Sequence, residues 1–106
     1  MIQNIDIDIS TEIFKLVNFW KGFHEALKKF ASISGQYLQK GDNKIMTIYR
    51  QGNILYQKGI KDIEKLRDCE IKLLRNEINL NEVKNIIEIA YRNRGEANSF
   101  DQEYFN

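Results

Sequence analysis

The sequence predicts an all-α fold: a long antiparallel helical hairpin followed by a shorter third helix. Apolar residues recur at 3–4 spacing through most of the chain, which is the period of an amphipathic helix. The 106 residues include no proline and only six glycines, so little interrupts long elements. Two of these glycines, Gly52 and Gly59, lie one heptad apart in an otherwise helical stretch. Each costs a helix about 1 kcal/mol relative to alanine, which a closely packed partner helix would explain.

The first nine residues differ from the rest of the chain. Isoleucine and aspartate alternate over residues 5–9, a period of two that is typical of a strand. Because no second strand is predicted, we expect residues 1–9 to be loose, or strand-like when bound to another chain.

The first long helix is expected from about residue 11 to residue 39. Ser10 and Thr11 are its candidate N-caps. The width of its apolar stripe indicates contacts with two neighbouring helices. The stripe consists of Ile13, Leu16, Trp20, Phe23, Leu27, Phe30 and Tyr37, widened by Val17, Phe19, Ala31, Ile33 and Leu38.

Residues 40–43, Lys-Gly-Asp-Asn, predict the hairpin turn, because glycine suits the left-handed residue that ends a helix. The second helix is expected over about 44–78. Within it, Asp62 and its neighbouring carboxylates alternate with basic residues, which is typical of a solvated face. Glu70 falls at an expected core position, where the hairpin should diverge.

A symmetric fold-back about residue 41 predicts the partners of the two glycines. Gly52 would lie opposite Phe30, and Gly59 opposite Phe23. In each pair an aromatic ring would fill the space that the missing side chain leaves, as dense packing requires.

The third helix is expected over about 80–94. Asn79 and Glu82 form a variant of the capping box at its start. Gly95 suits its C-terminal cap, which leaves 96–106 as an aromatic tail. The alternative is one uninterrupted helix from 44 to 94.

Composition indicates a single small domain, residues 1–106, and excludes several classes of protein. Charge is balanced, with 16 basic and 15 acidic residues. The single cysteine, Cys69, cannot form an internal disulfide and fits a reducing compartment. No apolar stretch approaches the roughly 20 residues of a membrane span. We therefore expect a cytoplasmic protein with no membrane association.

The sequence carries no motif for catalysis, metal binding or nucleotide binding. His24 is the only histidine, and no ligand or catalytic partner is patterned around it. We therefore expect no enzyme activity, no metal or cofactor, and no small-molecule substrate.

Aromatic residues exceed what a thin hairpin core needs. Five of them lack an obvious partner in the hairpin: Phe14, Phe19, Phe100, Tyr104 and Phe105. Unused apolar faces of a small bundle commonly mark a partner site or self-association. The sequence therefore predicts a non-catalytic protein-protein interaction module, such as an adaptor, secretion partner, chaperone or small inhibitor of a larger machine, or a bundle completed by dimerisation. The alternative is that the third helix and the tail cover these residues within one chain.

The second function considered is nucleic-acid binding. Five basic residues of the second helix form a line at 3–4 spacing that could contact phosphates: Lys58, Lys61, Lys65, Lys72 and Arg75. The balanced charge of the chain makes this the less favoured function.

Overall fold

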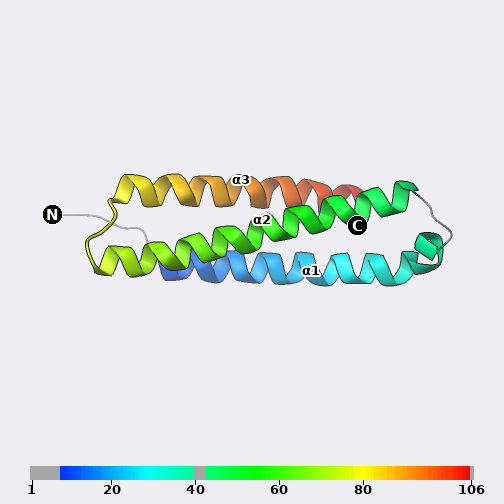
Figure 1. Ribbon diagram of the computed structural model, residues 1–106, viewed down its shortest axis with the longest axis horizontal. Coiled ribbons are helices and arrows are strands. Elements are labelled where there is room, and N and C mark those ends of the chain that lie inside the picture. The colour runs from blue at the N-terminus through cyan, green and yellow to red at the C-terminus, as the bar shows by residue number, and fades with distance from the viewer. Residues whose placement is uncertain (1–7, 40–42, 106) are drawn as a thin grey trace.

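The chain folds into three helices, each antiparallel to the one before it, that pack side by side in an elongated bundle of 60 × 21 × 17 Å (Figure 1). The computed structural model describes residues 8–39 and 43–105, with side chains described for 8–35 and 43–105. Helix α1 spans Ile9–Gln39, α2 spans Asn43–Leu74 and α3 spans Leu80–Tyr104. No strand occurs among the described residues, and the predicted all-α hairpin with a shorter third helix is confirmed.

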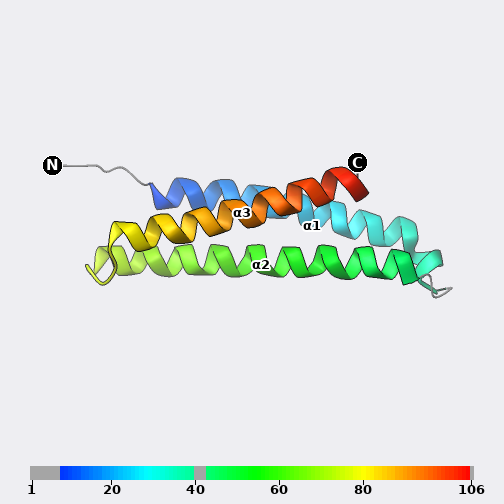
Figure 2. The same ribbon diagram turned by 90° about the horizontal axis from the view of Figure 1, so that it is seen from above.

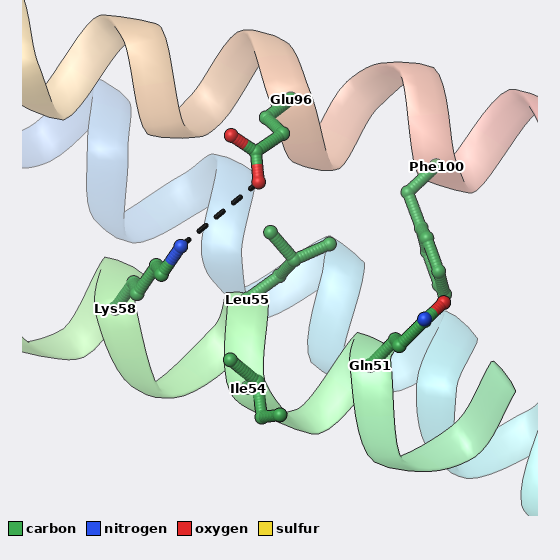
Figure 3. Close-up of a pocket in the computed structure, with 6 residues that line it drawn as sticks. All are labelled: Gln51, Ile54, Leu55, Lys58, Glu96 and Phe100. Atoms are coloured by element: carbon green, nitrogen blue, oxygen red, sulfur yellow. Dashed lines mark ion pairs between the residues drawn. The ribbon is translucent and has the colours of Figure 1, made fainter. Parts of the chain in front are cut away.

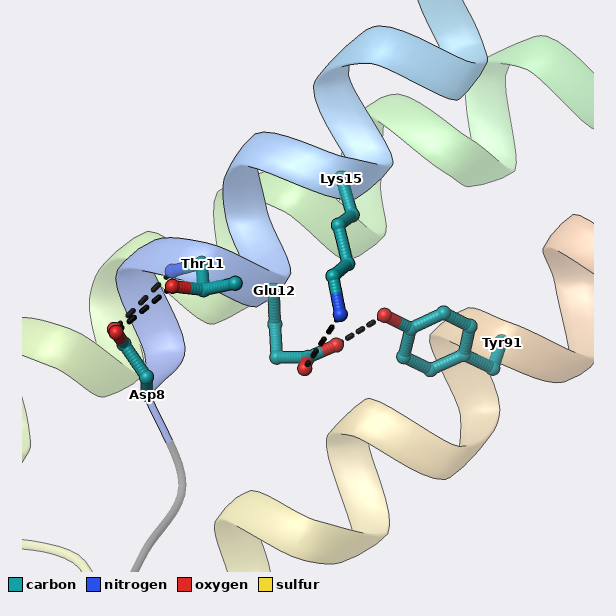
Figure 4. Close-up of polar contacts among 5 residues, drawn as sticks. All are labelled: Asp8, Thr11, Glu12, Lys15 and Tyr91. Carbon is teal, nitrogen blue, oxygen red and sulfur yellow. Dashed lines mark hydrogen bonds and ion pairs between the residues drawn. The ribbon is translucent and has the colours of Figure 1, made fainter.

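Helix α1 begins earlier than predicted, because Asp8 is its N-cap in place of Ser10 or Thr11. The backbone N–H of Thr11 donates to Asp8 Oδ1 at 3.2 Å, and Thr11 Oγ1 donates to Asp8 Oδ2 at 2.8 Å (Figure 4). Ile9 is helical and buried, so it does not belong to a loose or strand-like segment. The rest of that expected segment, residues 1–7, lies outside the described residues.

The hairpin register is set by Trp20, which occupies the space beside Gly59. A Cβ added to Gly59 would lie 2.6 Å from Trp20 Cζ2 and closer still to Cδ2 and Cε2. Because Trp20 is only 1% exposed, its ring has little room to move aside. The predicted partner, Phe23, was wrong by one helical turn. A 3–4 repeat specifies which face of a helix is buried, and a shift of one turn along the axis preserves that face.

Gly52 is a meeting point of all three helices. A Cβ at this position would lie 2.8 Å from Leu27, 3.2 Å from Phe100 and 3.5 Å from Phe105. The predicted partner Phe30 was wrong by the same one-turn shift. The expectation that large side chains pack against both glycines holds, although the particular partners differ.

Helix α2 ends at Leu74 rather than near residue 78, in a Schellman motif. The N–H of Glu77 donates to the carbonyl of Lys72 at 2.8 Å, and the N–H of Asn76 donates to that of Leu73 at 3.1 Å. Asn76 has a φ of 57°, in the left-handed region that asparagine tolerates better than most residues. This turn excludes an uninterrupted second helix.

The hairpin does not diverge at Glu70. Its half-buried carboxylate accepts a hydrogen bond from Ser10 Oγ across the α1–α2 seam. A hydroxyl donor therefore satisfies the acid at a position where the sequence pattern expects an apolar residue. The two helices stay packed up to the first turn of α1.

Helix α3 begins as predicted. The N–H of Glu82 donates to Asn79 Oδ1 at 2.9 Å, and Asn79 Nδ2 donates to Glu82 Oε1 at 3.0 Å. These reciprocal bonds confirm the predicted variant of the capping box, in which the side-chain amide of Asn79 is the donor to Glu82 in place of the backbone N–H.

The predicted end of α3 was wrong. The helix passes through Gly95 and continues to Tyr104, so Gly95 is not its cap and most of the expected tail is helical. One interior glycine costs about 1 kcal/mol. The partial burial of Phe100 and Phe105 beyond it offsets this cost, since burying such a ring completely contributes about 1.5–3 kcal/mol.

Helix α2 contacts both other helices (Figure 2). Leu55 and Asp62 of α2 face α3, and the buried Cys69 continues the same heptad row. The fully buried residues of α3 are small and also heptad-spaced: Val83, Ala90 and Ala97. Small side chains let the α3 backbone approach α2 closely.

Asp62 corrects the expectation of a solvated acidic face. It is only 4% exposed and accepts a hydrogen bond from Asn93 Nδ2 at 2.8 Å. The pattern of alternating charges around Asp62 gave no sign that a third helix would cover this position.

We expect Gly59→Ala to lower the free energy of unfolding by about 1–3 kcal/mol, the usual cost of overpacking a core. Gly22→Ala in α1 is the matched control, because nothing lies within 4 Å of its added Cβ. It should raise the free energy of unfolding by up to about 1 kcal/mol. Urea denaturation measures both, and equal effects would contradict the role given to Trp20.

The Asp8 cap should make stability depend on pH. Its hydrogen bonds with Thr11 lower the pKa of Asp8 below the ordinary 3.8. A carboxyl whose pKa is lower in the folded state stabilises the fold above its unfolded pKa, and this contribution is lost as pH falls through the folded pKa. Asp8→Ala should therefore melt below wild type near neutral pH, with the difference shrinking in acid. Asp8→Asn keeps a capping oxygen and should not show this pH dependence. A difference that stays constant from neutral pH into acid would contradict the assignment.

Candidate functional site

Helix α3 stops before the tip of the α1–α2 hairpin (Figure 2). Tyr104, its last residue, lines the same hollow as Gln51 of α2. The same hollow reaches Asn43 and Lys44, and Figure 2 shows the start of α2 extending past the end of α3. At this end of the bundle α1 and α2 lie together without α3 over them.

Two hollows of about 410 Å³ each flank Tyr104. One lies between α1 and α3, and the other lies between α2 and α3. We call the large apolar residues that line them the tip surface: Phe30, Ile33, Ile48, Tyr104 and Phe105.

The tip surface combines exposed apolar groups with a polar rim. Ile33 is 66% exposed and Tyr104 is 37% exposed. Lys29 and Asp101 border the first hollow, and Gln51 borders the second. An apolar centre within a polar rim is the usual anatomy of a protein-binding surface.

Tilted and edge-to-face contacts between aromatic rings hold the tip surface in place. The ring of Phe105 lies 5.2 Å from Phe30, 5.8 Å from Phe23 and 5.4 Å from Phe100, while Phe100 lies 4.8 Å from Tyr104. Such pairs contribute about 0.5–1.5 kcal/mol each beyond area burial. The end of α3 is therefore packed against α1, and Tyr104 projects from it.

The negative charge of Glu103, together with a hydrogen bond from the phenol to it, raises the pKa of Tyr104. Because the single phenol hydrogen is directed to Glu103, Tyr104 can offer a partner its oxygen as a hydrogen-bond acceptor.

The five aromatic residues predicted to bind a partner have different surroundings. Phe14 is 66% exposed on the solvent side of α1. Phe19 packs 5.0 Å from Trp20, and the guanidinium of Arg94 lies 5.2 Å from its ring centroid. The other three, Phe100, Tyr104 and Phe105, form the end of α3. All of these residues except Phe14 therefore contact other side chains of the same chain. A role of the five residues in binding a partner stays a prediction.

A third hollow, of about 290 Å³, lies further along the α2–α3 seam (Figure 3). The ion pair between Lys58 and Glu96, at 4.0 Å, spans one end, and Phe100 lines the other. Ile54 is 57% exposed at its rim.

Two of the five basic residues proposed for phosphate contact already pair with carboxylates. Lys58 pairs with Glu96 across helices, and Lys72 lies 3.1 Å from Asp68 within α2. These carboxylates offset part of the positive charge along a line that also includes Lys61, Lys65 and Arg75. Nucleic-acid binding stays a prediction.

The two most reactive side chains, those of His24 and Cys69, are packed against other residues of the chain. His24 stacks on Tyr56 with centroids 4.3 Å apart. Cys69 is 2% exposed, and burial and the nearby Asp68 raise the pKa of its thiol. Among the described residues, no group of three or more His, Cys, Asp or Glu side chains could hold a metal ion.

No helix within the described parts of the chain is long and apolar enough to cross a membrane. Comparisons with protein-family models, curated proteins and solved structures find no match to this chain.

Sequence reasoning found part of the tip surface. It selected Tyr104 and Phe105 because they lacked hairpin partners, but it assigned Ile33 to a widened core stripe and did not select Ile48. Both isoleucines lie on helical faces that a longer third helix would cover. The length and register of α3 leave Ile33 exposed and Ile48 half-buried beside a hollow.

Two Phe→Ala changes distinguish a phenylalanine that stabilises the fold from one that does not. Phe105→Ala should lower the free energy of unfolding by about 1–3 kcal/mol, because it removes a half-buried ring from the aromatic cluster. Phe14→Ala should change it by no more than about 0.5 kcal/mol, since that ring is 66% exposed. Thermal unfolding followed by circular dichroism measures both, and equal losses would contradict the docking of Phe105.

Proposed function

We propose that this chain is a non-catalytic interaction module that presents its tip surface to another protein. The observation that carries the proposal is the exposed apolar end of the hairpin beyond α3, with Ile33 66% exposed beside Tyr104. Exposed apolar groups gathered around two hollows are a common feature of partner-binding sites.

The geometry suggests how binding energy would be distributed. Tyr104 projects between the two hollows, and tyrosine is among the residues that most often dominate interface energetics. Because the ring of Tyr104 already packs against Phe100, little conformational entropy of this side chain would be lost on binding. An apolar side chain from the partner would enter either hollow.

Several kinds of partner fit such a surface. An adaptor, a secretion partner, a chaperone or a small inhibitor would each use it to hold a larger protein. A second copy of this chain could also cover it, which would make the protein a homo-oligomer. The single buried cysteine supports a reducing compartment, and we retain the cytoplasm as the proposed location.

A capture experiment with matched variants tests the proposal. Tagged wild type, the Ile33→Ser/Tyr104→Ser double variant and Phe14→Ser are incubated with nuclease-treated lysate of the native cells. Bound proteins are quantified by mass spectrometry. Phe14 and Ile33 are both 66% exposed, so Phe14→Ser controls for loss of an exposed apolar group.

We expect at least one protein whose capture falls about tenfold or more in the double variant, which corresponds to about 1.4 kcal/mol, and is unchanged in Phe14→Ser. Circular dichroism should show equal helicity in all three proteins. Loss of capture only in Phe14→Ser would place the site on the solvent side of α1. No tip-dependent partner, together with a monomer by light scattering, would refute the proposal.

A further inference from the structure

We propose that α3 is a detachable helix, which undocks as a unit from an α1–α2 hairpin that stays folded. This inference goes beyond the proposed function and does not depend on it. It rests on a difference between the two seams of α2.

The α1–α2 seam buries large side chains. Trp20 fills the space beside Gly59, and Leu16 and Leu66 are both 0% exposed. Apolar stabilisation grows with the area removed from water, so this seam is strong.

The seam between α2 and α3 buries small side chains of α3. Its fully buried residues are Val83, Ala90 and Ala97. Each offers less apolar area than a leucine or tryptophan, so α3 gains less from its most deeply buried positions than α1 does.

Hydrogen bonds contribute part of the interaction that docks α3 on the other two helices. Tyr91 donates to Glu12 of α1, which also pairs with Lys15 at 3.9 Å (Figure 4). Asn93 donates to Asp62 of α2 at 2.8 Å. When α3 leaves, water can replace each of these hydrogen bonds. For Asp62, only 4% exposed when docked, undocking restores the hydration of a buried acid and so lowers the cost of opening.

The helix itself is weakened at Gly95. Nothing lies within 4 Å of a Cβ added there, so this glycine is not required by packing within the chain. It lowers the helical stability of α3, which therefore depends on docking for its order.

The far end of α3 makes the opening cooperative. Phe100 and Phe105 both pack beside Gly52, where they meet Leu27 of α1. These rings hold the C-terminal end of α3 in place, so the helix does not fray from that end, and we infer that α3 leaves as one unit.

Cys69 is a native probe of this opening. It is 2% exposed and lies one heptad after Asp62, on the row of α2 that faces α3. Undocking of α3 uncovers its thiol while α1 and α2 remain paired.

The test is the rate at which iodoacetamide alkylates Cys69 in native buffer, under conditions in which opening is faster than alkylation. The equilibrium for opening follows from the ratio of this rate to the rate in unfolded protein. Urea denaturation gives the equilibrium for global unfolding. We expect opening to be at least about tenfold more favourable than global unfolding, which corresponds to about 1.4 kcal/mol.

Two glycine variants identify the helix that moves. Gly95→Ala should slow alkylation about fivefold, because it stabilises α3. Gly22→Ala, equally free of atoms within 4 Å of the added Cβ, should leave the alkylation rate unchanged, because α1 stays folded in the open state. Hydrogen exchange read by mass spectrometry should show α3 exchanging ahead of α1 and α2.

Three outcomes would overturn the proposal. Alkylation could be no faster than global unfolding permits. Both glycine variants could slow it equally, which would mean that the whole bundle opens. Cys69 could react while α3 exchanges no faster than α1, which would mean that a local fluctuation of α2 exposes the thiol.

Discussion

The packing of Trp20 against Gly59 is the contact on which the rest of the structure depends. A tryptophan ring fits between two closely spaced helices only where one of them lacks a side chain, and this match selects one register of the hairpin. The same register places Leu27 beside Gly52 and leaves room there for Phe100 and Phe105. The fit has a cost: among the described residues, the buried Trp20 Nε1–H has no hydrogen-bond acceptor, a loss of about 1–3 kcal/mol.

The two seams of α2 use different chemistry. Toward α1, large side chains meet glycines, and apolar burial dominates. Toward α3, alanines allow close approach, and a buried carboxylate, Asp62, pairs with an amide. Such a hydrogen bond adds little net stability, but removing one of its two partners leaves the other buried and unsatisfied, which is costly. The pair therefore favours the docking position in which both groups meet. Such a seam fixes the docking position of α3 without binding the helix tightly. A detachable helix requires this combination.

The tip surface arises from the same aromatic residues that hold the bundle together. Phe30 and Phe105 pack against each other on one side of it, and Phe100 supports Tyr104 on the other. Their packing leaves Ile33 and Tyr104 at the surface, because α3 ends before it can cover them. Folding and the proposed binding therefore share one cluster, in which the inner rings stabilise the fold and the outer residues remain available to a partner.

The sequence by itself determined the features that depend on neighbours along the chain. It predicted three helices from apolar periodicity, the Asn79 cap from local hydrogen bonds, and large side chains against both glycines from the cost of glycine in a helix. Tertiary structure decided the rest. The one-turn register, the burial of Asp62 and the continuation of α3 past Gly95 each depend on contacts between residues far apart in sequence. Tyr104 and Phe105 could be selected from sequence because aromatic surplus is visible there. Ile33 and Ile48 could not be selected, because the position at which α3 ends determines how exposed they are. That position depends on packing between segments far apart in sequence, which a local pattern does not specify.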